Sequence, residues 1–220
     1  MKYKAIIFDM DGLILDTESI ESRAFEKLLN EYGVEPKPFP NGLIHQIGGA
    51  DASIYYEKFK NQYNFPADQE VIQNKKRAYW QEMLEKENIE AFPGFFELLE
   101  LAKKENLIIA LASNRNEKFV HLVLEKLGVR HYFNVIVGPA EGRKHKPYPD
   151  IYLETAKAVG VNPAECLALE DTDGGIISAK DAGMKAIAVP NVYTADHDFS
   201  RADLVVKSLE DINMEALESL

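Results

Sequence analysis

The 220-residue sequence contains a single cysteine, Cys166, which excludes an intrachain disulfide. This cysteine lies in the apolar stretch 166–169, where a buried thiol is a more common role than a nucleophile. No apolar run approaches the roughly 20 residues that a membrane-spanning helix needs. The amino terminus also lacks the pattern of a secretory signal peptide. We therefore expect a cytoplasmic protein in a reducing compartment.

Basic residues are outnumbered by acidic residues. Lysine and arginine number 25 against 36 aspartates and glutamates, which leaves a formal net charge of −11. An acidic surface repels nucleic acids and anionic membranes, so the composition argues against both as main partners. A small anionic substrate remains compatible, because water and salt screen distant surface charges whereas a local cationic site acts at short range.

Apolar runs alternate with amphipathic segments along most of the chain. The sequence predicts buried strands at residues 5–8, 107–112, 135–137, 166–169, 186–189 and 203–206. Apolar residues at helical spacing predict helices over 119–127, 151–159 and 176–182, each followed by a glycine. This alternation predicts an α/β fold with a three-layer, Rossmann-like core, in which helices cover both faces of a parallel sheet.

The alternation is interrupted between the first strand and residue 107. Asp16, Thr17 and Glu18 are typical of a helix start. The apolar stripe of this helix comprises Ala24, Phe25, Leu28, Leu29 and Tyr32. Further helices are predicted over 54–63 and 71–84, the second with Ala78, Tyr79 and Met83 buried.

We therefore predict two domains, a Rossmann-like catalytic core at 1–16 and 90–220 and a helical cap domain at 17–89. Because the insert directly follows the first strand, we expect it to cover that strand's carboxyl end and to exclude water from it.

The first strand runs into Asp9-Met10-Asp11-Gly12. Open parallel sheets bind their ligands at the carboxyl ends of the strands. Two carboxylates so close together repel each other unless a cation or a proton lies between them, so the pair indicates metal-assisted chemistry. An EF-hand calcium loop beginning at Asp9 is disfavoured, because Ile14 occupies the position at which such a loop needs glycine.

Polar residues also follow three later strands. Ser113 and Asn114 combine a hydroxyl with backbone N–H groups at a helix start, which suits a phosphate, although both residue types also cap helices. Lys146 ends the basic run 143–146 and precedes Pro147, so a fixed lysine there could neutralise a phosphate. The rest of that run, Arg143, Lys144 and His145, is expected to be solvated.

Glu170 and Asp171 end the predicted strand 166–169. Carboxylates are rarely buried unless they are paired or bound to a metal, although Asp171 could also cap the next helix. Taken together, these strand ends offer metal ligands, a phosphate cradle and a positive charge. Those are the groups that phosphoryl transfer requires.

The motifs resemble those of the haloacid-dehalogenase-like hydrolases, in the branch with a helical cap inserted after the first strand. That branch includes β-phosphoglucomutase-like proteins and phosphosugar phosphatases. The matching segments are 8–18, 111–114, 146–150, 169–175 and 182–184.

The resemblance implies a Mg²⁺-dependent phosphatase that hydrolyses a small phosphate monoester, such as a sugar phosphate, through an aspartyl-phosphate. By this resemblance Asp9 is the nucleophile and Asp11 is the general acid and then the general base. Mg²⁺ would be held by Asp9, the backbone carbonyl of Asp11 and Asp171, with Glu170 in or near its coordination shell. The phosphoryl oxygens would be bound by Ser113, Asn114 and Lys146. The expected partner is a small phosphorylated metabolite, and the expected oligomeric state is a monomer or weak dimer.

Two alternatives remain open. A hexose-phosphate mutase of the β-phosphoglucomutase type uses the same chemistry, but Glu21 stands where those mutases carry histidine, and the loop 46–51 lacks their cations. A phospho-accepting receiver module would also combine acidic residues, a serine and a lysine, but the long helical insert argues against it. Arg115 is expected to be a solvated residue at the start of a helix.

Overall fold

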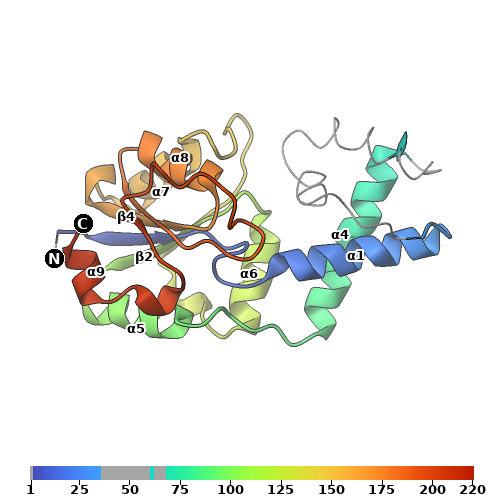
Figure 1. Cartoon of the computed structure of the whole chain (residues 1–220), viewed down its shortest axis with the longest axis horizontal. Helices are drawn as coiled ribbons and strands as arrows, with labels where there is room; N and C mark the ends of the chain where they lie inside the picture. The colour runs from blue at the N-terminus through green and yellow to red at the C-terminus, as the bar shows by residue number, and fades with distance from the viewer. Residues whose placement is uncertain (1, 36–59, 62–67) are drawn as a thin grey trace. The chain divides into compact units, whose positions relative to one another are not determined.

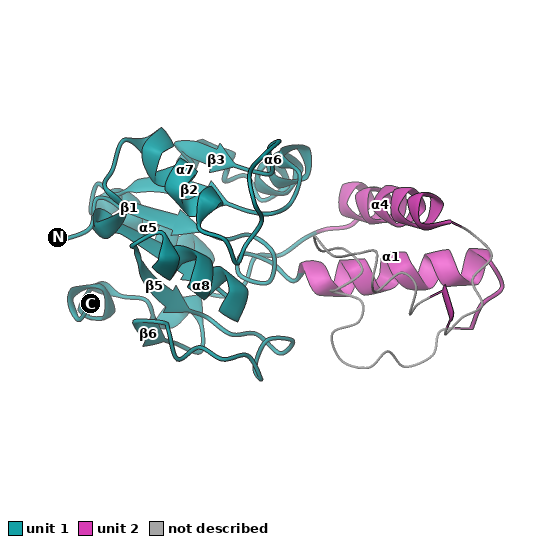
Figure 2. Ribbon diagram, turned by 90° about the horizontal axis from the view of Figure 1, so that it is seen from above, with its two compact units in different colours: residues 1–16, 89–220 teal, residues 17–88 magenta. Residues whose placement is uncertain are grey.

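The computed structural model describes residues 2–35, 60–61 and 68–220 (Figure 1). The loop at 46–51 and most of the helix predicted over 54–63 lie outside these residues. The chain forms two compact units, which Figure 2 colours separately. Unit 1 comprises Met1–Asp16 and Ile89–Leu220, and unit 2 comprises Thr17–Asn88. That unit 2 acts as a cap over the end of the first strand stays a prediction.

Unit 1 is built on a six-stranded sheet in the order β3-β2-β1-β4-β5-β6, in which every pairing is parallel. The strands are β1 (Ala5–Phe8), β2 (Ile108–Ala112), β3 (Val135–Val137), β4 (Cys166–Glu170), β5 (Lys185–Ala188) and β6 (Leu204–Val205). The predicted α/β fold with a Rossmann-like parallel sheet is therefore confirmed.

Helices cover both faces of this sheet (Figure 1). They are α5 (Phe95–Lys104), α6 (Glu117–Lys126), α7 (Asp150–Val159), α8 (Asp173–Asp181) and the short α9 (Met214–Glu218). Short 3₁₀ turns lie at η1 (Arg130–Tyr132), η2 (Pro163–Glu165) and η3 (Leu209–Asp211). Helices α7 and α8 pack on one face of the sheet, and α5 packs on the other.

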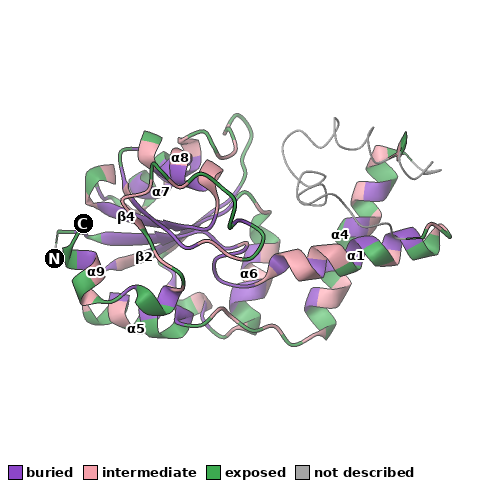
Figure 3. Ribbon diagram, viewed as in Figure 1, coloured by how far each residue is buried: buried purple, intermediate pink, exposed green. Residues whose placement is uncertain are grey.

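The central strand β1 contributes to both layers of the core. Ala5 and Ile7 belong to the apolar cluster that also includes residues of α7 and α8. On the other face, the ring of Phe8 makes edge-to-face contacts with Phe95 and Phe133, at centroid distances of 5.9 and 6.0 Å. All four residues of β1 and all five of β4 are buried (Figure 3), which explains why these strands are continuous apolar runs in the sequence.

In unit 2, α1 (Thr17–Glu31) packs against α4 (Gln69–Lys86). The predicted stripe of α1 is buried at Ala24, Phe25, Leu28 and Leu29. The predicted buried face of α4 is wrong, because Ala78 is exposed and Tyr79 and Met83 are only partly covered. The residues that α4 buries are Ile72, Lys76, Trp80 and Leu84.

The buried face of α4 passes through a lysine, which explains the error. Lys76 lies 2.8 Å from the carboxylate of Glu21 on α1, and both side chains are nearly covered. An ion pair permits a lysine to be buried, whereas a prediction based on apolar spacing assigns it to the surface.

Among the described residues, no helix has the length and apolar character needed to cross a membrane.

Replacing Phe8 with alanine should lower the free energy of unfolding by about 3–5 kcal/mol, because the change opens a cavity between Phe95 and Phe133. Phe96→Ala is the matched control, since Phe96 is 47% exposed and its loss should cost less than about 1 kcal/mol. Chemical denaturation followed by circular dichroism measures both values. Equal losses at the two positions would contradict the packing of Phe8 between the rings of Phe95 and Phe133.

Candidate active site

Residues from four segments of unit 1 meet at the carboxyl ends of the central strands. Asp9 directly follows β1 and Ser113 directly follows β2. Lys146 lies in the loop between β3 and α7, and Glu170 is the last residue of β4. The register of the strands brings these residues close together, because Phe8 pairs with Leu111 on one side and with Leu169 on the other. The residues that follow these positions therefore emerge side by side.

The ammonium group of Lys146 makes hydrogen bonds to three groups of the site. Its ammonium group donates to Asp9 Oδ1 at 2.5 Å, to Glu170 Oε1 at 2.6 Å and to the carbonyl oxygen of Ala112 at 2.9 Å. The side chain is only 8% exposed. Burial acts to lower the pKa of Lys146, but the carboxylates of Asp9 and Glu170 outweigh it and raise the pKa above its usual value. The lysine therefore carries its charge at neutral pH.

The loop after β2 contacts the backbone of this lysine. The backbone N–H of Lys146 donates to the side-chain oxygen of Asn114 at 3.3 Å, which links the loop after β3 to the loop after β2. The Lys146–Pro147 peptide bond is cis. Asn114 thus contacts the lysine loop in this structure, and the binding of phosphate by Asn114 stays a prediction.

Glu170 has a further partner that the sequence did not reveal. The hydroxyl of Tyr152 on α7 donates to Glu170 Oε1 at 2.7 Å, and Thr172 Oγ1 donates to Oε2 at 3.4 Å. Burial and the nearby carboxylate of Glu170 raise the pKa of Tyr152 well above its usual value, so the phenol keeps its proton. In the sequence, Tyr152 is indistinguishable from the other apolar residues that α7 buries.

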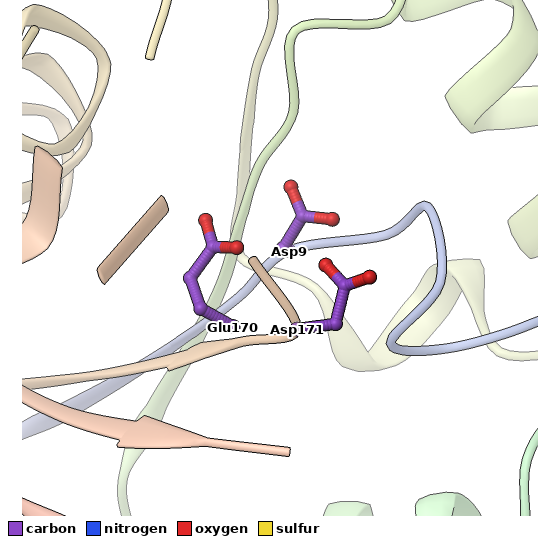
Figure 4. A group of neighbouring side chains, drawn as sticks. All are labelled: Asp9, Glu170 and Asp171. Carbon is purple, nitrogen blue, oxygen red and sulfur yellow. The ribbon is translucent and has the colours of Figure 1, made fainter. Parts of the chain in front are cut away.

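Three carboxylates form a compact acidic group, namely Asp9, Glu170 and Asp171. All three are buried, and each offers an oxygen within 4.8 Å of the others. Figure 4 shows the three carboxyl groups close together at the strand ends. Burial raises the pKa of Asp9 to about 7, although Lys146 opposes the shift. Burial and the neighbouring carboxylates of Asp9 and Glu170 likewise raise the pKa of Asp171 well above its usual value.

The acidic group has the chemistry of a site for a hard divalent cation. Its donors are carboxylate oxygens, which Mg²⁺ and Ca²⁺ prefer. A single ammonium group, that of Lys146, bonds to two of the three carboxylates. A divalent cation would relieve the remaining repulsion, and the residues therefore fit a bound metal.

Asp11 faces other partners. The hydroxyl of Ser113 donates to Asp11 Oδ2 at 3.3 Å, and Arg115 Nε lies 2.7 Å from Asp11 Oδ1. The expectation that Arg115 is solvated is therefore wrong, since its side chain is only 22% exposed and forms an ion pair. The sequence prediction assigned metal binding to the backbone carbonyl of Asp11 rather than to its carboxylate, and that assignment stays a prediction.

The loop after β5 also reaches the site. Asn191 Nδ2 donates to the carbonyl oxygen of Gly12 and to Asp171 Oδ2, both at 2.9 Å. Asn191 is not among the residues predicted from the sequence, because an asparagine after a proline is typical of an ordinary turn. Asn191 lies two residues past the predicted strand 186–189. Other predicted strands are also followed within two residues by candidate functional groups, so this position was the signal that the sequence offered.

Comparison with known proteins places the chain among hydrolases. Residues 6–189 match the family described as haloacid dehalogenase-like hydrolase. The chain is 35% identical to the putative phosphatase YhcW of Bacillus subtilis, over 97% of this chain and 96% of that protein. It is 32% identical to hexitol phosphatase B of Escherichia coli K12, with 97% and 96% covered. It is 31% identical to the β-phosphoglucomutase of B. subtilis, with 97% and 93% covered.

A solved structure shares the whole fold. The crystal structure of CbbY from Rhodobacter sphaeroides in complex with phosphate superposes with a TM-score of 0.84 at 26% identity. The match covers 98% of this chain and 99% of that one.

The raised pKa of Asp9 predicts a pH-dependent stability in the metal-free protein. A carboxyl group whose pKa rises on folding stabilises the folded state below its unfolded pKa, and this contribution is lost as pH rises through the folded pKa. For Asp9 the range runs from 3.8 to about 7, which corresponds to a loss of up to about 4 kcal/mol. Asp9→Asn should therefore be more stable than the wild type at pH 8, and the gain should vanish near pH 4.

Denaturant titrations in the presence of a chelator measure this difference. Asp203→Asn is a control for which the opposite change in stability is expected. Burial acts to raise the pKa of Asp203, but its hydrogen bonds to Lys180 and Lys185 outweigh burial and lower it. That variant should lose stability at pH 8. Equal stability of wild type and Asp9→Asn at pH 8 would contradict the prediction.

Proposed function

The chain belongs to the haloacid dehalogenase-like hydrolase family, and on this basis we propose that it is a Mg²⁺-dependent phosphatase acting through an aspartyl-phosphate. The substrate would be a small phosphate monoester, with a phosphorylated sugar or sugar alcohol as the leading class. The observation that carries the proposal is the contact of the Lys146 ammonium group with the buried carboxylate of Asp9, inside an acidic group that fits a divalent cation.

Asp9 would act as the nucleophile. One of its oxygens attacks phosphorus while the bond from phosphorus to the ester oxygen breaks, which leaves a phosphoryl group on Asp9. Lys146 orients the carboxylate by its contact with Oδ1 and places positive charge where the phosphoryl oxygens arrive. Ser113, directly after β2, would donate to a phosphoryl oxygen through its hydroxyl. Asn114 would add a side-chain or backbone donor.

Asp11 would supply the proton. It protonates the leaving oxygen in the first step, and in the second it takes a proton from the water that attacks phosphorus and releases inorganic phosphate. In the structure Asp11 is bound to Ser113 and Arg115, so this role requires the leaving oxygen to replace one of those contacts. Such an exchange is compatible with catalytic groups that reach their final geometry only with substrate present.

The acidic group would hold the metal. Asp9, Asp171 and the backbone carbonyl of Asp11 are the proposed ligands, with Glu170 in or near the coordination shell. A bound Mg²⁺ would reduce the repulsion between the carboxylates and an incoming phosphate dianion. The contacts of Glu170 with Lys146 and Tyr152 favour a role in orienting the lysine.

The relatives support the substrate class. Hexitol phosphatase B and β-phosphoglucomutase are each named for a phosphorylated sugar or sugar alcohol. The match to a hydrolase family over residues 6–189 disfavours the receiver module. The cytoplasmic location and the monomer or weak dimer stay predictions.

Wild-type protein should release inorganic phosphate from a panel of metabolite phosphates with Mg²⁺ and lose this activity when the metal is chelated. Asp9→Asn should reduce the rate by about 10³-fold or more, because the amide cannot form the phosphoryl intermediate. Asp173→Asn is the matched control, since Asp173 lies on the first turn of α8 and pairs with His197. A fully active Asp9→Asn protein would exclude the mechanism.

Product analysis with β-glucose 1-phosphate separates hydrolysis from isomerisation. We expect any turnover to yield free glucose and phosphate in equal amounts. Glucose 6-phosphate as the main product would instead identify a mutase.

A further inference from the structure

Asn191 links two loops that carry acidic residues of the site. Its side-chain amide has two N–H donors, and both are used. One donates to the carbonyl oxygen of Gly12, in the loop after β1, and the other to Asp171 Oδ2, at the end of β4. The loop after β5 therefore ties together two segments that lie far apart in the sequence.

The amide of Asn191 is itself fixed. The backbone N–H of Tyr193 donates to Asn191 Oδ1 at 2.8 Å, so the side-chain oxygen and nitrogen cannot exchange places without losing hydrogen bonds. The backbone N–H of Asn191 donates to the hydroxyl of Thr194 at 3.0 Å, and Thr194 is buried. These contacts orient the two donors before any ligand arrives.

The two linked loops approach each other closely. Gly12 has a φ of +78°, and a Cβ atom built there would lie 2.2 Å from Asp171 Oδ2 and 2.7 Å from Asn191 Nδ2. Only glycine fits at such a position. The amide of Asn191 thus occupies the junction at which the loop after β1 meets the carboxylate of Asp171.

The adjacent carboxylates of Glu170 and Asp171 are held in different ways. Glu170 receives the ammonium group of Lys146, which compensates its charge. Asp171 receives the neutral amide of Asn191 on one oxygen. A neutral donor orients a carboxylate without adding positive charge and leaves its second oxygen for another ligand. That arrangement suits a carboxylate that binds a cation.

We infer that Asn191 is a positioning residue that orients the Asp171 carboxylate and the Gly12 loop for binding a divalent cation. The inference rests on the proposed function, because it concerns the same metal site. The loop after β5 thereby contributes to metal affinity, whereas the reaction itself is carried out by residues at the ends of β1, β2 and β4 and in the loop after β3.

The direct test is calorimetric titration of Mg²⁺ into the metal-free, full-length protein. Asn191→Ala should weaken Mg²⁺ binding by about 10- to 100-fold relative to wild type, as is usual when a group that orients a metal ligand is removed. Asn162→Ala is the matched control. Asn162 accepts a hydrogen bond from the backbone N–H of Ala164 in the turn before β4, at the opposite end of that strand, and its loss should leave Mg²⁺ affinity unchanged.

A second measurement separates positioning from general damage. In Asn191→Ala the Mg²⁺ concentration for half-maximal phosphate release should rise about 10- to 100-fold, while kcat at saturating Mg²⁺ returns close to the wild-type value. A merely structural defect would lower kcat at every Mg²⁺ concentration and would overturn the inference. If Asn191→Ala does not fold, Thr194→Val removes the hydroxyl that orients the loop, and it should weaken Mg²⁺ binding in the same direction.

The outcomes distinguish the inference from the function on which it rests. If the wild type binds Mg²⁺ and Asn191→Ala binds it equally well, the inference is overturned and the proposed function stands. An equal loss in Asn162→Ala would also overturn the inference. A wild type that does not bind Mg²⁺ would overturn the metal-dependent function together with the inference.

Discussion

The repulsion among the carboxylates of Asp9, Glu170 and Asp171 is the constraint on which the rest of the site depends. Burial removes these groups from water, which would otherwise screen their charges from one another. Lys146 bonds to two of them, and the hydroxyl of Tyr152 adds a hydrogen bond to Glu170. Asn191 orients the third. The surrounding loops therefore hold in place a concentration of negative charge that would otherwise drive them apart.

The sheet creates this concentration through its strand order. β1 lies between β2 and β4, and its last residue is in register with Leu111 and Leu169. The backbone N–H of Asp9 extends the ladder by donating to the carbonyl oxygen of Leu169 at 3.0 Å. Asp9 is thus fixed beside Glu170 by main-chain hydrogen bonds, and side chains then distribute the charge. The strand order brings the carboxylates together, whereas Lys146 and its neighbours supply the hydrogen bonds that hold them in place.

The sequence was sufficient for most of the sheet and for the residues at its edge, because fully buried strands are continuous apolar runs and polar residues directly after them stand out. It failed where a residue's role depends on a partner distant in sequence. Lys76 is buried because Glu21 on another helix pairs with it, and Arg115 is half-buried because it meets Asp11. Tyr152 and Asn191 have the appearance of a core residue and a turn residue, and only the three-dimensional structure shows what their polar atoms bind.

The site draws its contacts from almost the whole length of unit 1, which has a consequence for biosynthesis. Lys146 meets Asp9 across 137 positions of sequence, and Asn191 meets Gly12 across 179. A chain emerging from the ribosome contains Asp9 early, yet the lysine that compensates its charge is made much later and the amide of Asn191 later still. Because domains complete their folding only when such distant segments have been synthesised, the acidic loop after β1 must wait for its partners. An unfinished chain therefore carries the nucleophilic carboxylate without the groups that orient it.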